Sequence, residues 1–91
     1  MFVNGFQEMI SMKRMMQPIQ VMCWSDEQGR ITPSSFKPEW SPTDMRAGRV
    51  IQRSTSKEAG RLVQVFLCQN EARRFELQYD YAATKWYLTK W

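Results

Sequence analysis

The sequence contains no histidine and only two cysteines among its 91 residues. Without histidine the chain lacks the commonest general base, the commonest metal ligand and any serine–histidine or cysteine–histidine nucleophile. Cys23 and Cys68 are too few for a disulfide scaffold and form no CxxC pair. We expect both to be reduced and packed as small hydrophobic residues, with a disulfide or redox pair as the alternative. The sequence predicts no enzymatic activity, no metal site and no cofactor.

Long apolar runs are also missing. No run approaches the roughly 18 residues of a membrane-spanning helix, and no apolar signal-peptide region follows the basic pair Lys13 and Arg14. The chain has neither a phosphate-binding glycine loop nor a dinucleotide fingerprint. These features predict a cytoplasmic protein with no membrane contact and no small-molecule substrate.

Hydrophobic residues make up 43% of the chain and include four Trp, three Tyr and five Phe, which is enough for one small domain with an aromatic core. The clearest pattern is strict alternation over residues 75–81, which is typical of a strand with one buried and one solvated face. The predicted buried face holds Phe75, Leu77, Tyr79 and Tyr81, and the predicted solvated face holds Glu76, Gln78 and Asp80.

Further strands are expected at residues 19–24, 30–34, 49–54, 62–68 and 86–91. Their spacing predicts an all-β fold, a five- to six-stranded antiparallel meander that forms a small barrel. Asp26–Gly29 reads as a tight turn, 54–60 as a polar loop, and Asn70 as a left-handed turn residue. Pro33 removes a ladder hydrogen bond, which predicts an edge or short strand at 30–34.

Two helices are possible. Ser41, Pro42 and Asp44 form a helix-start signature, so a short helix near residues 42–47 is predicted, ended by Gly48. If it continued, Arg46, Arg49 and Arg53 would share a face, but the β-branched pair at 50–51 favours a strand.

Residues 1–17 contain five of the seven methionines. This arm is a short amphipathic helix, a loose extension or an upstream addition to a chain starting at Met15 or Met16; the domain proper is residues 18–91.

The net charge of +4 is local. The segment from Met45 to Arg61 holds five basic residues against one acid, Glu58, so the rest of the chain is neutral. Basic grooves with aromatic platforms bind single-stranded nucleic acid. The candidates for such a polyanion site are the cations Arg49, Arg53, Arg61, Arg73 and Arg74 and the aromatic residues Trp24, Trp40, Tyr87 and Trp91.

Protein association is the function that we expect first. A weakened edge strand, a Met-rich arm and a strand that is apolar on both faces could each meet a partner chain. If the outer face of Leu62, Phe66 and Cys68 is uncovered, it forms an apolar patch that favours association. We therefore expect a non-catalytic interaction module that forms homodimers or binds a partner protein, with single-stranded nucleic-acid or polyanion binding as the alternative.

One pattern is familiar. Ile19, Val21, Trp24, Asp26, Gly29, Pro33 and Phe36, followed by a basic strand and a tail from Tyr79 to Trp91, resemble small uncharacterised bacterial β-domains of unknown function. The resemblance covers about residues 18–91 and implies a bacterial cytoplasmic protein. It implies no activity.

Overall fold

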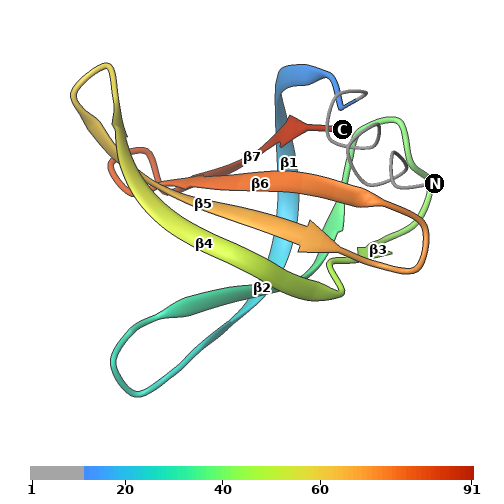
Figure 1. Cartoon of the computed structure of the whole chain (residues 1–91), viewed down its shortest axis with the longest axis horizontal. Coiled ribbons are helices and arrows are strands. Elements are labelled where there is room, and N and C mark those ends of the chain that lie inside the picture. The colour runs from blue at the N-terminus through green and yellow to red at the C-terminus, as the bar shows by residue number, and fades with distance from the viewer. Residues whose placement is uncertain (1–11) are drawn as a thin grey trace, which may run out of the picture.

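The computed structural model describes residues 12–91, and the N-terminal helix considered above lies outside the described residues. The described strands are β1 (Arg14–Ser25), β2 (Ile31–Lys37), β3 (Met45–Arg46), β4 (Arg49–Glu58), β5 (Arg61–Gln69), β6 (Arg74–Asp80) and β7 (Lys85–Lys90). They form one antiparallel sheet in the order β3-β2-β1-β7-β6-β5-β4, which curls into a half-barrel (Figure 1). The all-β prediction is confirmed, and the described strands number seven instead of five or six.

The core lies on the inner side of the curled sheet. Phe66, Phe75, Leu77 and Leu88 are fully buried, and their side chains come from the three neighbouring strands β5, β6 and β7. Phe36 of β2 closes the core from the opposite side, with its ring centroid 4.9 Å from that of Phe75. A small domain with this aromatic packing gains most of its stability from apolar area removed from water.

The alternation in β6 is confirmed in its first half and wrong in its second half. Phe75 and Leu77 are buried, and Tyr79 packs against the core. Tyr81 is 41% exposed, because β6 ends at Asp80 and Tyr81 belongs to the following turn. Gln78 and Asp80, predicted to be solvated, are 8% and 7% exposed. β6 is an interior strand, so side chains of both neighbouring strands flank them.

The polar loop predicted at 54–60 is much shorter in the structure. β4 continues to Glu58, and Ala59 and Gly60 alone form the turn, with φ of 53° and 81°. Two consecutive left-handed residues make the turn type whose twist matches a hairpin. β5 is an interior strand, as expected from its apolar residues on both faces.

The helix predicted near residues 42–47 is absent. The Ser41 hydroxyl donates to the Thr43 carbonyl oxygen at 2.7 Å and accepts the Thr43 N–H at 3.3 Å, so it stabilises a local turn instead of capping a helix. After Asp44 the chain forms β3, which pairs with residues 35–36 of β2. Tertiary pairing therefore overrides a local helix-start signature.

The β1–β2 hairpin, at the lower left of Figure 1, confirms the predicted Asp26–Gly29 turn. The β1–β2 turn runs from Asp26 to Gly29, whose φ is 79°. Pro33 of β2 pairs with β1 but lies beyond the short β3, so it occupies an edge position, as expected. β1 begins at Arg14, so the last residues of the predicted arm belong to the sheet.

Candidate functional site

A close approach between two chain segments forms the most distinctive corner of the molecule. Gly48, between β3 and β4, has a φ of 71°, and a Cβ there would lie 2.8 Å from the Cα of Asn70 and would clash with the Gln69 carbonyl oxygen. Only glycine satisfies both the left-handed backbone and the missing space. The β3–β4 corner therefore rests directly on the turn between β5 and β6.

Asn70 links the two segments through its side chain. Its amide nitrogen Nδ2 donates to the Arg46 carbonyl oxygen at 2.9 Å, and its Oδ1 accepts the N–H groups of Ala72 and Arg73 at 2.8 and 2.9 Å. The left-handed conformation predicted for Asn70 is wrong, since its φ is not positive. Its side chain makes the turn instead, by an Asx-type pattern.

The two segments that meet at this corner, which we call the basic corner, carry four arginines: Arg46 and Arg49 from one segment and Arg73 and Arg74 from the other. The segments 45–49 and 69–74 contain one acid, Glu71. Gln69 pairs with Arg49 on one side and Arg74 on the other, so these two arginines share a face of the sheet, roughly 10 Å apart. Arg74 also donates through Nε to Gln69 Oε1 at 3.3 Å. The corner carries a local excess of positive charge.

Two tryptophans adjoin the basic corner. The Arg73 guanidinium lies 4.0 Å from the centre of the Trp91 ring system and donates through Nη2 to the Trp91 carbonyl oxygen at 2.8 Å. Trp40, which is 50% exposed, meets Trp91 edge-to-face with centroids 5.6 Å apart. The predicted residues Arg49, Arg73, Arg74, Trp40 and Trp91 are thus brought to one end of the fold.

A cavity of about 580 Å³ opens at this end, lined by Met45, Arg46, residues 70–73 and Trp91. The Nε atom of Arg73 is buried and has no hydrogen-bond partner among the residues that the structure describes. An unpaired buried donor is costly, so a ligand that moved the covering groups aside and supplied an acceptor would remove that cost.

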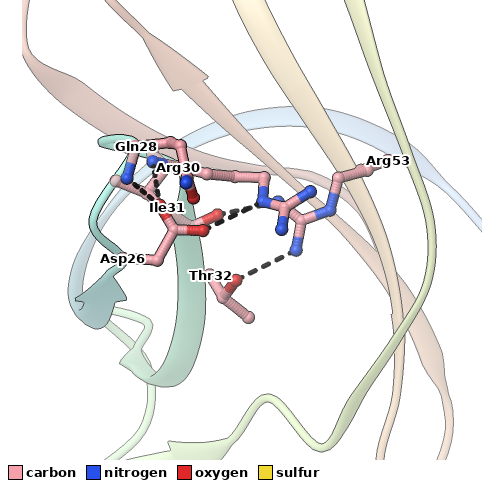
Figure 2. A network of polar contacts seen from close by, with 6 residues as sticks. All are labelled: Asp26, Gln28, Arg30, Ile31, Thr32 and Arg53. Atoms are coloured by element: carbon pink, nitrogen blue, oxygen red, sulfur yellow. Dashed lines mark hydrogen bonds and ion pairs between the residues drawn. The ribbon is translucent and has the colours of Figure 1, made fainter.

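Arg53 lies elsewhere and is engaged inside the protein. It donates through Nη1 to the Ile31 carbonyl oxygen and through Nη2 to Thr32 Oγ1, both at 2.9 Å, as Figure 2 shows for Thr32. Its guanidinium lies 5.4 Å from the centre of the buried Phe66 ring. These contacts join β4 to β2 across the open side of the half-barrel, which makes Arg53 a structural residue.

The β1–β2 hairpin that Arg53 anchors has a rigid turn. Asp26 Oδ1 accepts the N–H groups of Arg30 and Gln28 at 2.8 and 3.0 Å, and Oδ2 accepts Arg30 Nε at 3.2 Å (Figure 2). The hydrogen bond from the Arg30 N–H is the main cause that lowers the pKa of Asp26. On β1 beside this turn, Trp24 is 73% exposed and Met22 is 67% exposed. Trp24 therefore lies on a separate surface from the basic corner.

The last two predicted residues are also apart from the basic corner. Arg61 pairs with Asp80, Nη2 to Oδ2 at 2.9 Å, at the start of β5. Tyr87 is half-buried in β7, between Gln78 of β6 and Pro18 of β1. Neither adds to the cluster.

The apolar patch considered for β5 does not form. Phe66 and Cys68 are fully buried in the core, and only Leu62 is exposed, at 45%. Both cysteines are free, but Cys23 is exposed, which corrects the expectation that both are packed. The last four residues of β1 are exposed and extend beyond the core, so Cys23 does not pack against it.

The sequence did not identify Arg46, Asn70 and Glu71 as residues of the site. Their convergence depends on the Gly48 approach, which connects segments more than 20 residues apart. The one available signal was the pair of arginines on either side of Gly48.

No protein-family model, curated protein or solved structure matches the chain. The resemblance to bacterial β-domains therefore stays a prediction. Within residues 12–91 no group of three or more metal-ligating side chains occurs, and no helix of that part is long and apolar enough to cross a membrane. Function must be argued from the site.

Proposed function

We propose that this chain is a non-catalytic binding protein whose basic corner binds a polyanion. The observation that supports the proposal best is the convergence of Arg46, Arg49, Arg73 and Arg74 around the Gly48–Asn70 contact. Arginine presents a planar fork of donors that matches phosphate, and it keeps its charge at every physiological pH.

The cluster is more than a solvated charge run. Arg46 and Arg49 are exposed and make no ion pair within residues 12–91, so their charges are available to a ligand. The backbone that carries them is held by the Asn70 hydrogen bonds and by the glycine contact. A preorganised cluster loses less conformational entropy on binding than arginines on a flexible loop.

The test is a titration of labelled single-stranded RNA and DNA, followed by fluorescence anisotropy, from about 50 to about 200 mM salt. With four phosphate contacts the slope of log K against log salt is expected near −3, a loss of roughly fifty-fold over that range. The double variant Arg46→Ala/Arg49→Ala should flatten the slope by about 1.4.

A matched control removes the same charge elsewhere. Arg30 lies on the β1–β2 hairpin and Lys57 on the β4–β5 hairpin, both away from the basic corner (Figure 1). The variant Arg30→Ala/Lys57→Ala loses two positive charges, as the test variant does. Equal losses in the two double variants would assign binding to net charge and contradict a specific corner. No binding at low salt would rule out polyanion binding altogether.

Protein association is a second candidate function, favoured by one observation. Met22 and Trp24 are both more than 60% exposed and alternate along β1 beside a rigid turn. Exposed tryptophan is the residue type most enriched at the energetic centres of interfaces. Sedimentation across a wide concentration range, for the full chain and for a chain lacking residues 1–11, which leaves β1 intact, tests this. Self-association that Met22→Ser/Trp24→Ser abolishes would support it, and a strict monomer in both forms would count against homodimers.

A further inference from the structure

The cavity at the basic corner has a mixed chemistry that a simple phosphate site would not have. Its volume of about 580 Å³ lies within the range of small-ligand sites. The residues that line it include Trp91, Arg73 and Glu71, which are an aromatic residue, a cation and an acid. A phosphate deep inside it would meet the like charge of Glu71, so phosphates fit better at the exposed Arg46, at the rim of the cavity, and at Arg49.

The polar groups in the cavity are complementary to a nucleobase. Arg73 lines the cavity and its Nε is a shielded donor without an acceptor among the described residues, and Glu71, two residues before it, is exposed and supplies an acceptor. The edge of a cytosine offers a carbonyl oxygen and an amino group, which match a donor and a carboxylate. Thymine offers Glu71 a single ring N–H and no amino group.

Two tryptophan rings lie beside these groups. Trp91 is held by Phe36, Phe75 and the Arg73 guanidinium, so its ring forms a fixed wall. Trp40 touches Trp91 and leaves half of its surface in water. Bases stack on such rings only when they are unpaired, because a duplex hides their faces.

We infer that the polyanion is a single-stranded nucleic acid: one unpaired base occupies the cavity against Trp91, the next stacks on Trp40, and the backbone phosphates lie on Arg46 and Arg49. This inference rests on the proposed polyanion binding and adds a base-reading pocket to it. Arg73 and Glu71 give the pocket a preference for a base with an amino group.

The experiment compares labelled strands of about 12 nucleotides, as oligo(dC), oligo(dT), and one mixed sequence offered single-stranded and as a duplex, with heparin as a polyanion that has no bases. The single strand should bind at least about tenfold more tightly than its duplex. Trp40→Ala should weaken single-strand binding by about tenfold and leave heparin binding unchanged. Trp24→Ala, which removes an exposed ring far from the cavity, is the control.

A second readout tests the base edge. Oligo(dC) should bind at least about fivefold more tightly than oligo(dT). The variant Glu71→Gln should reduce the ratio of these two affinities. Thermal unfolding of each variant verifies folding, and Trp40→Phe, which keeps a ring, should retain most of the affinity.

The outcomes separate the two proposals. Equal binding of heparin, duplex and single strand, with no effect of Trp40→Ala, overturns the base pocket and leaves polyanion binding standing. Equal affinity for oligo(dC) and oligo(dT) overturns the role of Glu71. Binding of none of these ligands at low salt overturns both proposals.

Discussion

The Arg53 guanidinium lies 5.4 Å from the centre of the Phe66 ring, one side chain at the edge of the sheet and the other at the bottom of the core. The same guanidinium donates two hydrogen bonds to β2, at Ile31 and Thr32. β2 and β4 are not paired in the sheet, so this contact holds the open side of the half-barrel together. Arg53 therefore both bridges the edge strand β4 to β2 and packs against the core.

Arg53→Ala should therefore destabilise the fold by about 1–3 kcal/mol, since it removes two hydrogen bonds and a cation–π contact. In a domain of this size each kcal/mol lowers the melting temperature by about 4–8 °C. Thermal unfolding followed by circular dichroism measures the effect. Arg49→Ala, which removes an exposed arginine from the same strand, should stay within about 0.5 kcal/mol of the parent protein. Similar melting temperatures for the two variants would contradict the bridging role.

Gly48→Ala should cost more stability than Gly29→Ala. Both glycines have positive φ, so both variants carry backbone strain of about 1–2 kcal/mol. Only Gly48 lacks space for a Cβ, because the Gln69 backbone lies against it, whereas nothing lies within 4 Å of a Cβ at Gly29. The difference, about 1–3 kcal/mol from overpacking, is read from urea unfolding of the two variants. Equal losses of unfolding free energy in the two variants would contradict this account, since the backbone around Gly48 would then make room for a Cβ at no cost.

The local patterns in the sequence predicted much of the fold. The strands at 19–24 and 75–79 and the Asp26–Gly29 turn depend on neighbouring residues only, and the structure confirms these elements. The helix at 42–47 was wrong because its capping residues say nothing about the pairing of β3 with β2. Local signals decide local structure when no distant strand competes for the backbone.

The site was less predictable than the fold. The arginines and tryptophans were chosen by residue type, and five of the eight lie at one end because the Gly48 corner contacts the Asn70 turn. Arg53 and Arg61 had the same apparent chemistry but face internal partners. Composition identifies candidate cations, whereas tertiary contacts determine which of them remain available.

Asp80 should make stability depend on pH. Burial raises its pKa, but hydrogen bonds from the Ala83 N–H and from Arg61 outweigh burial, so the pKa lies below the usual 3.8. A lowered carboxylate pKa stabilises the fold above the unfolded value, and that stability is lost as the pH falls through the folded value. The melting temperature should be level down to about pH 5 and fall below about pH 4. Asp80→Asn should melt lower at neutral pH and show a shallower acid decline; an unchanged decline would assign the effect to other carboxylates.

The two thiols should react at very different rates. Burial raises the pKa of Cys68 to about 12, so almost no thiolate is present at neutral pH, whereas Cys23 is exposed. A chromogenic disulfide reagent should modify one thiol rapidly in the native protein and the second only after denaturant is added. Cys23→Ser should abolish the rapid phase. Two rapid phases in the native protein would contradict the burial of Cys68.

The most direct test of the central claim is amide chemical-shift mapping of the isotope-labelled chain during titration with a single-stranded oligonucleotide. If the basic corner binds the strand, the shifts concentrate on residues 45–49, 70–74 and 91, and the indole N–H of Trp40 moves with them. The amide chemical shifts of residues 22–31, in the β1–β2 hairpin, should not change. Shifts centred on that hairpin, or spread evenly over all basic residues, would contradict a polyanion site at the Gly48–Asn70 contact.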